Sequence, residues 1–293
     1  MIDLDNKNYR YTIKGKCTLV ETNSGNFILK EKKENVNIKG LFSYLKSRGF
    51  TTFADVIDDT RREVNVYEYV EDCIMPKEQR AEDLINCISD LHSKTLYFKE
   101  VREDKYKEIY ENILSNINFL ENYYDTLFMR FFKEKYPAPS HNLFIQNFYK
   151  IMGALSFCKD ETDNWYDLVK NEKNMRVCII HNDLSIDHFL KSQKDAIISW
   201  DKHRVDTPVL DLVKLYQNDN LKYNFNNVLN KYNENFGFNK HEKKLFFILI
   251  TIPNKIRFDE TEFKNTTKVR HLLDSLYKTE ELIKPYYSKD KEE

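Results

Sequence analysis

Short β-type segments give way to long helical patterns near residue 72, and this change limits the folds that the chain can adopt. In the first part, Asn23-Ser24-Gly25-Asn26 is typical of a hairpin turn between two strands. The apolar spacing within Val36–Arg48 predicts one helix, which Gly49 ends. Three strands, a helix and two strands together predict a small antiparallel sheet covered by that helix. The predicted strands are Arg10–Ile13, Cys17–Thr22, Phe27–Lys30, Thr52–Ile57 and Val64–Val70.

Helical spacing dominates the chain from Lys77 onward. Apolar residues recur every three or four positions over several long stretches, which predicts helices whose apolar stripes form a core. The chain is predicted to fray at Lys289–Glu293. The sequence therefore predicts an α+β fold, with a β-rich part at residues 1–72 and a larger, mainly helical part at residues 73–293. An island of short strands is predicted within the helical part at Val177–Ile180, Phe189–Leu190 and Asp195–Trp200.

Composition argues against several classes of function. The 46 Lys and Arg residues are balanced by 47 Asp and Glu, and this balance does not suit a nucleic-acid binder with a strongly basic surface. The longest apolar stretch, Leu245–Ile252, is too short to span a bilayer, and Met1–Lys7 has no secretory-signal pattern. The five cysteines form no CxxC pair and are expected to be buried, reduced thiols. We therefore expect a cytoplasmic protein with neither a nucleic-acid nor a membrane partner.

One stretch carries residues suited to phosphoryl transfer. The apolar strand ending at Ile180 delivers His181 and Asp183 into a loop, and His188, a potential metal ligand, follows five positions after the aspartate. A short hairpin then brings a second acidic residue, Asp201, back toward the same place. Phosphoryl transfer needs a carboxylate that orients and deprotonates the attacking hydroxyl, and metal ligands that hold the nucleotide phosphates. The ordered set of residues favours this chemistry more strongly than any one of them alone.

At these residues the chain resembles the aminoglycoside phosphotransferase and choline kinase-like superfamily, which shares the protein-kinase fold. The HGDxxxxN motif of that superfamily is matched by HNDLSIDH, its IDW-type element by ISWD, and its P-x-x-DL segment by PVLDL. Within the superfamily, the chain looks most like the CotS-type spore coat proteins. The resemblance implies a bilobal protein-kinase-like fold, with a small antiparallel sheet in the amino-terminal lobe, a larger helical carboxyl-terminal lobe, and ATP between them.

The resemblance also implies roles for individual residues. Lys30 matches the strand lysine that contacts the nucleotide phosphates, and Asp183 matches the catalytic base. His181 matches the residue that braces the catalytic loop, and Asp211 matches the structural aspartate that fixes this loop from the following helix. The hinge between the lobes is expected at Glu68–Pro76, where backbone groups would meet the adenine. We expect Lys30 to face His181 and Asp183 across one nucleotide-sized slot.

Three departures from the family pattern concern the metal and the lysine. His188 stands where the catalytic loop has a metal-binding Asn, and Mg²⁺ prefers oxygen ligands to an imidazole. Ser199 stands where the IDW element has its metal-binding Asp. The predicted helix at 36–48 has no Glu to pair with Lys30, and neither Glu34 nor Glu63 is an obvious substitute.

Alternatives remain for the individual roles. Lys30 is either a phosphate ligand or an exposed strand lysine. His188 is either a metal ligand or a histidine that is hydrogen-bonded inside the loop. Asp201 is either a metal ligand displaced by two residues or the partner of Lys202 or Arg204 in an ion pair.

Two functions from different classes follow. The first is an ATP-dependent phosphotransferase for a small hydroxylated molecule, in which Asp183 takes the hydroxyl proton, Lys30 holds phosphate, and Asp201 with Asp187 or His188 recruits Mg²⁺ or Mn²⁺. With two metal ligands changed, we expect weak or absent activity with Mg²⁺. The second is a catalytically inactive pseudokinase that serves as a binding or structural protein, for example among spore coat proteins.

Overall fold

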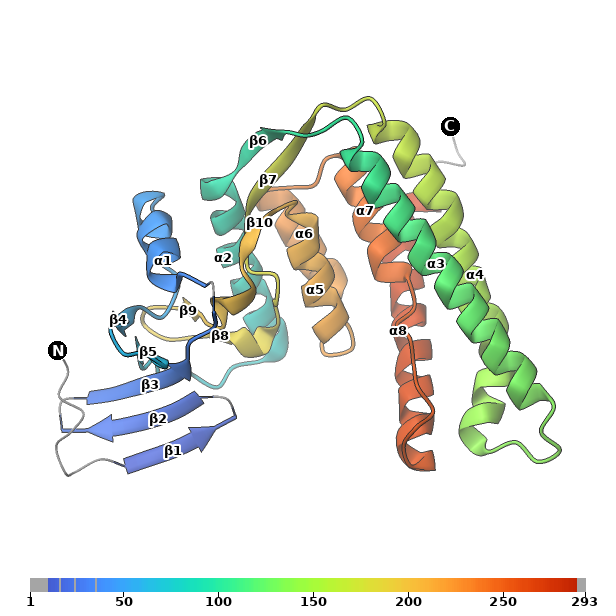
Figure 1. Ribbon diagram of the computed structural model, residues 1–293, viewed down its shortest axis with the longest axis horizontal. Helices are drawn as coiled ribbons and strands as arrows, with labels where there is room; N and C mark the ends of the chain where they lie inside the picture. Colours follow the sequence, from blue (N-terminus) through green and yellow to red (C-terminus); the bar gives the residue numbers. More distant parts are fainter. Residues whose placement is uncertain (1–9, 16, 24, 35, 289–293) are drawn as a thin grey trace.

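The computed structural model describes residues 10–15, 17–23, 25–34 and 36–288 of the chain. The predicted frayed segment Lys289–Glu293 and the first nine residues lie outside these ranges, as does Ser24 of the predicted hairpin turn. Within them, the structure has a small antiparallel sheet at the amino-terminal end and a helical remainder, which confirms the predicted α+β class (Figure 1).

The amino-terminal sheet has five antiparallel strands in the order β1-β2-β3-β5-β4. In register, Lys30 of β3 lies between Cys17 of β2 and Asn65 of β5. The β2–β3 hairpin forms as predicted, with Thr22 paired to Gly25, whose φ of +127° suits a glycine. The strands are β1 (Arg10–Lys14), β2 (Cys17–Thr22), β3 (Gly25–Glu31), β4 (Val56–Asp58) and β5 (Val64–Glu68).

One helix, α1 (Ile38–Ser47), forms between β3 and β4 where the apolar spacing predicts it, and its Phe42 packs against Phe53 and Trp200. The side chain of Asn37 accepts a hydrogen bond from the amide of Gly40 and caps the helix. The predicted strand at Thr52–Ile57 is largely wrong, because its first residues leave the sheet. Phe53 is fully buried, stacks on Phe42 of α1 at a centroid distance of 4.0 Å, and bridges to Ile197 of the helical part. Phe53 thus joins the two parts of the molecule, with its side chain against α1 and its backbone bridged to Ile197.

Seven further α-helices make up most of the larger part within the described residues. Figure 1 shows α3 and α4 running together as a long arm, with α8 beside them, on the side away from the amino-terminal sheet. Pro139 begins α4 at a position where a helix needs no amide donor. The helices are α2 (Lys77–Thr95), α3 (Lys105–Phe132), α4 (Pro139–Val169), α5 (Val209–Asp219), α6 (Phe225–Asn235), α7 (Lys240–Thr251) and α8 (Glu262–Ser288).

The predicted island of strands is present inside the helical part. Strand β7 (Asn174–Ile180) lies between β10 (Arg204–Asp206) and β6 (Tyr97–Glu100). Neither of these two outer strands was predicted from the sequence. A two-residue hairpin of β8 (Phe189–Leu190) and β9 (Ala196–Ile197) follows. The predicted strand at 195–200 is shorter than expected because Ser199 has a left-handed φ of +70° and Trp200–Lys202 forms a 3₁₀ turn, η2.

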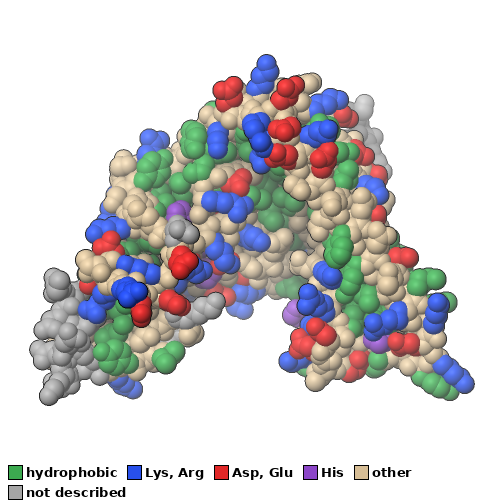
Figure 2. All heavy atoms as spheres, viewed as in Figure 1, with side chains coloured by type: hydrophobic (Ala, Val, Ile, Leu, Met, Phe, Trp, Pro, Cys, Tyr) green, Lys and Arg blue, Asp and Glu red, His purple; other side chains and the backbone are tan. Residues whose placement is uncertain are grey.

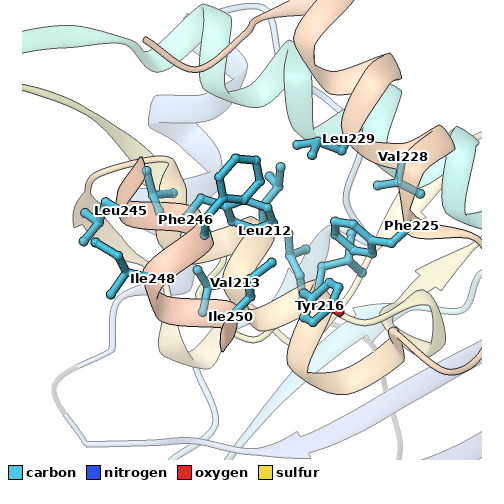
Figure 3. Close-up of a cluster of buried hydrophobic side chains, with 14 of the residues drawn as sticks. Leu212, Val213, Tyr216, Phe225, Val228, Leu229, Leu245, Phe246, Ile248 and Ile250 are labelled. Carbon is cyan, nitrogen blue, oxygen red and sulfur yellow. The ribbon is translucent and has the colours of Figure 1, made fainter. Parts of the chain in front are cut away.

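A cluster of buried side chains fixes the position of α5 relative to the other helices (Figure 3). Leu212 and Val213 face α7, and Tyr216 packs edge-on against Phe225 of α6 at a centroid distance of 4.9 Å. Burial of such side chains contributes about 1.5–3 kcal/mol each to folding. The packing matters for the site because Asp211 lies in the first turn of α5.

Two predictions from composition concern the helices and the cysteines. In the part of the chain that the structure describes, no helix combines the length and apolarity needed to cross a bilayer. All five cysteines are free, but burial is complete only for Cys158 and Cys178. The expectation of burial is wrong for Cys73, which is exposed in the segment between β5 and α2.

Candidate active site

Asp211 holds the loop that carries the motif. This fully buried carboxylate accepts hydrogen bonds from the amides of His181 (2.8 Å to Oδ2) and Asn182 (2.6 Å to Oδ1). His92 of α2 donates a third hydrogen bond through Nε2, at 3.1 Å, and its other ring nitrogen lies 2.8 Å from the hydroxyl of Tyr232. Bonds of this kind to a buried carboxylate are among the stronger ones in proteins. Asp211 therefore lies where the predicted structural aspartate should be.

His181 is buried behind the loop instead of lining an open slot. Its Nε2 donates to the carbonyl of Ile198 at 2.8 Å, and its ring meets Trp200 edge-on at 5.0 Å. Burial lowers the pKa of His181, against the opposing charge of Asp211. The side chain therefore connects the loop after β7 to the segment after β9, which is consistent with the predicted bracing role.

His188 is hydrogen-bonded within the same loop. Its Nδ1 donates to the carbonyl of Asp183 at 2.7 Å, and its own carbonyl accepts from the amide of Ile198 at 2.9 Å. The geometry agrees with the alternative in which this histidine has a local hydrogen-bonding role. The neighbouring Asp187 points elsewhere, to Lys222 at 2.9 Å.

Lys30 forms an ion pair with Asp201. Both side chains are mostly buried, with 18% and 12% of their surfaces exposed. Helix α1 contains no acidic residue, so Asp201 supplies the carboxylate that the helix lacks. Neither predicted ion-pair partner of Asp201 is used in this way, because Lys202 pairs with Asp183 and Arg204 pairs with Asp206.

Lys202 lies 3.0 Å from Asp183, between Nζ and Oδ1. Partial burial raises the pKa of Asp183, but the hydrogen bond and the charge of Lys202 outweigh it, so the pKa lies below the ordinary value for an aspartate. A carboxylate with a lowered pKa is a weaker proton acceptor. Asp201 and Lys202 are adjacent in the η2 turn, so two consecutive residues neutralise the predicted phosphate ligand and the predicted base.

A cavity of about 300 Å³ lies where the amino-terminal sheet meets the segment after β9, and we call it the Lys30 cavity. Burial raises the pKa of Tyr67 on its wall to about 12, so this phenol stays neutral at physiological pH. The segment between β5 and α2, where the hinge is predicted, borders the cavity. Its lining residues are Cys17, Ile28, Lys30, Phe42, Ala54, Tyr67, Glu68, Tyr69, Val70, Asp72, Leu190, Ile197, Ile198, Ser199 and Trp200.

Asp183 lines a second, larger cavity of about 650 Å³, which we call the Asp183 cavity. The expectation that Lys30 faces His181 and Asp183 across one slot is therefore wrong, because Lys30 and Asp183 line different cavities and His181 lines neither. The η2 turn lies between them and contacts both. The second cavity is lined by Asn116, Phe119, Leu120, Asn182, Asp183, Lys202, Arg204, Leu210, Val213, Lys214, Gln217, Leu249, Ile252, Pro253, Asn254 and Lys255.

The residues at the predicted metal positions do not fit a Mg²⁺ site. Ser199 offers a neutral hydroxyl, His188 an imidazole, and Asp201 a carboxylate that is already paired with Lys30. Mg²⁺ requires near-octahedral oxygen ligands, of which carboxylates are the usual protein contribution. Among the residues that the structure describes, no three His, Cys, Asp or Glu side chains gather closely enough to hold a metal ion.

Three residues around the loop, His92, Asp219 and Lys202, were missed or assigned no such role in the sequence analysis. His92 supports Asp211, and only its place at the end of a predicted helix hinted at this. Asp219 accepts from the hydroxyl of Ser185 and the amide of Ile186, at 3.1 and 2.7 Å. Lys202 was considered only as a partner for Asp201. No spacing pattern could have revealed these pairs, because each joins separate elements.

Comparison with known proteins places this geometry in a recognised fold. No protein-family model and no curated protein matches the sequence. Among solved structures, an aminoglycoside phosphotransferase from Alicyclobacillus acidocaldarius superposes with a TM-score of 0.71 at 9% identity, covering 97% of this chain and 93% of that chain. The AMP-bound complex of a spectinomycin phosphotransferase gives 0.60 at 12% identity, covering 92% of each chain. A glucosamine kinase gives 0.55 at 9% identity, covering 97% of this chain and 78% of that chain.

The chain has a protein-kinase-like fold. At such low identities the likeness concerns the arrangement of the chain, so the chemistry has to be argued from the residues.

Proposed function

We propose that the chain is a kinase-like phosphotransferase that binds ATP in the Lys30 cavity and has a degraded metal site. The observation that carries the proposal is the composition of that cavity, which brings together the strand lysine, the predicted hinge segment and the residue aligned with the metal-binding Asp. About 300 Å³ lies at the lower end of the range of small-molecule sites, about 300–1,000 Å³. Apolar side chains from both sides, such as Ile28 and Ile198, suit the faces of an adenine ring.

The proposed reaction uses residues from both cavities. Lys30 holds a phosphate oxygen of ATP, and a hydroxyl of a small acceptor in the Asp183 cavity attacks the γ-phosphorus. The bond between that phosphorus and the leaving ADP oxygen breaks, and the hydroxyl proton passes to Asp183. His181 and Asp211 position the loop without touching the reacting atoms.

The proposal includes weak or absent turnover with Mg²⁺. Lys30 has to exchange Asp201 for phosphate, and Asp183 accepts a proton less readily because Lys202 lowers its pKa. Each ~1.4 kcal/mol added to the barrier slows the reaction tenfold. The changed ligands at 188 and 199 are therefore expected to leave weak or absent activity with Mg²⁺.

Nucleotide binding is the decisive test. Calorimetry with AMP and ATP, with Mg²⁺ and with Mn²⁺, should give binding that Lys30→Met weakens and that Mg²⁺ does not strengthen. Ser199→Asp combined with His188→Asn should introduce a Mg²⁺ dependence, because Asp tolerates the left-handed backbone at residue 199. Turnover by the unmodified chain at the rate of ordinary kinases would contradict the degraded site, and absence of any nucleotide binding would overturn the proposal.

The ion pairs Lys30–Asp201 and Lys202–Asp183 favour a second candidate, a catalytically inactive pseudokinase, because they occupy the predicted phosphate ligand and the predicted base. In this alternative the fold is a binding or structural module of the CotS type, with spore coat proteins as partners. The cytoplasmic assignment and the division into residues 1–72 and 73–293 likewise remain proposals from the sequence. Detection of ATP-dependent phosphorylation that Asp183→Asn abolishes would reject the pseudokinase, and co-purification with the spore coat would support it.

A further inference from the structure

The charge of the Asp183 cavity differs from what a cationic acceptor needs. Four cationic side chains line the cavity, and Asp183 is the one carboxylate among its described lining residues. Figure 2 shows the molecule hollowed between its two arms, with Lys and Arg side chains in and around the hollow. The four cationic residues are Lys202, Arg204, Lys214 and Lys255.

Two of these cations are not neutralised by the protein. Lys202 and Arg204 pair with Asp183 and Asp206. By contrast, the amine of Lys214 contacts only the side-chain oxygen of Gln217, at 3.4 Å, among the interactions of the described chain. The amine of Lys255 lies over the rings of Phe119 and Tyr123, at 4.6 and 4.4 Å from their centroids, and forms no ion pair with any residue that the structure describes.

The rest of the lining suits a polar ligand. The side-chain amides of Asn116, Gln217 and Asn254 line the same cavity and can hydrogen-bond to hydroxyl groups. Positive charges gathered in a concave site raise the local concentration of anions and repel cations. The cavity, about 650 Å³, lies within the range of about 300–1,000 Å³ for sites that hold a small molecule.

We propose that the Asp183 cavity binds an anionic, hydroxylated small molecule, one that carries a phosphate or carboxylate group on a sugar or polyol. Its anionic group would lie against Lys214 and Lys255, and a hydroxyl would lie near Asp183. A cationic ligand such as an amino sugar is disfavoured by the same charges. The role of this molecule as phosphoryl acceptor rests on the proposed function. The binding of the molecule in the cavity does not depend on that function.

The test compares three ligands that share one ring and differ in charge. Glucose 6-phosphate, glucose and glucosamine are titrated into the full chain by calorimetry at low and at moderate salt. We expect glucose 6-phosphate to bind at least about tenfold more tightly than the other two, since one charge-assisted contact is worth about that factor. Added salt should weaken this binding. Gluconate distinguishes a carboxylate from a phosphate as the anionic group.

Variants locate the binding. Lys214→Gln and Lys255→Gln should each weaken glucose 6-phosphate binding about tenfold. Lys150→Gln, which removes an exposed lysine from α4 outside the cavity, should leave it unchanged. Circular dichroism melting of each variant checks that the fold is kept.

Each result separates this inference from the proposed function. Equal or tighter binding of glucosamine, or failure of both glucose 6-phosphate and gluconate to bind at about 10 mM, overturns the anionic ligand while AMP binding still supports the nucleotide site. Anion binding that Lys214→Gln and Lys255→Gln weaken, together with no AMP binding, supports the anion site and overturns the phosphotransferase. Anion binding that neither variant changes overturns the assignment to this cavity.

Discussion

The Lys30 cavity and the Asp183 cavity lie on either side of the η2 turn, yet different elements and different kinds of side chain line them. Side chains of the amino-terminal sheet and of the segment around β9 make the first one narrow and mainly apolar. Helices α3 and α5 and the segment after α7 make the second one wider and rich in amides and cations. The difference indicates that a single motif can place two sites side by side while the ligand preference of each depends on elements far from the motif.

The largest effect on this arrangement should come from Asp211. Asp211→Ala leaves the buried amide of His181 and the partly buried amide of Asn182 without an acceptor, so the free energy of unfolding should fall by about 3 kcal/mol. Chemical denaturation measures the loss. Asp206→Ala, which removes a partly exposed partner of Arg204, is the matched control and should cost no more than about 1 kcal/mol. Equal losses of stability for both variants would contradict the role of Asp211 in holding the loop.

The Lys30 cavity should respond next. Lys30→Met leaves Asp201 mostly buried without its partner, and we expect a loss of about 1–3 kcal/mol of stability together with weaker AMP binding. Adding Asp201→Leu should recover part of the stability but none of the binding. The comparison between the cavities fails if Lys30→Met weakens glucose 6-phosphate binding as strongly as AMP binding.

A pH effect should arise from His181, which is fully buried behind the loop after β7. Burial keeps its pKa in the native state below the ordinary value, so below about pH 6.5 the unfolded chain takes up a proton that the native chain does not. Stability should therefore fall as the pH drops below that value, by at most about 1.4 kcal/mol per pH unit from this group. His181→Gln should flatten the dependence measured by urea denaturation.

His241 provides the control for that experiment. Burial also lowers its pKa, but it lies on α7, away from both cavities. His241→Gln should remove its own contribution and leave that of His181. If His181→Gln leaves the pH dependence of the free energy of unfolding unchanged between pH 5 and pH 6.5, the prediction that His181 stays unprotonated in the native state is wrong.

The smallest effect should come from Lys202. Lys202→Met removes the hydrogen bond and charge that lower the pKa of Asp183, so this pKa should rise, as carboxyl chemical shifts in NMR can measure. Stability should change by no more than about 1 kcal/mol, because the Lys202 side chain is 54% exposed. An unchanged pKa would mean that the ion pair does not persist in solution.

Much of the fold could be predicted because it depends on local patterns. The hairpin before Phe27, the helix over Ile38–Ser47 and the strand ending at Ile180 all follow from spacing and turn residues. The strand at Thr52–Ile57 was misplaced because Phe53 is buried against another part of the molecule. Strand β6 was missed because its residues are exposed and have no apolar alternation.

For the candidate site, the sequence identified the residues but not their ion-pair partners. The candidate residues His181, Asp183 and Asp211 come from one ordered motif, and in the structure Asp211 accepts hydrogen bonds from the loop amides of His181 and Asn182. The partners of Lys30 and Asp183 did not follow, since Asp201 and Lys202 meet them only after η2 turns between the two cavities. Charge in the Asp183 cavity was equally hidden, because its lysines come from α5 and from the segment after α7.

The adjacency of Asp201 and Lys202 has a mechanical consequence. Both residues belong to one three-residue turn, so a change in the backbone of η2 would alter the ion pair of Lys30 and that of Asp183 together. A ligand in one cavity would therefore affect the other cavity only if it shifts the backbone of this turn. Order of addition, with nucleotide before or after the anion, is the property in which that linkage would appear.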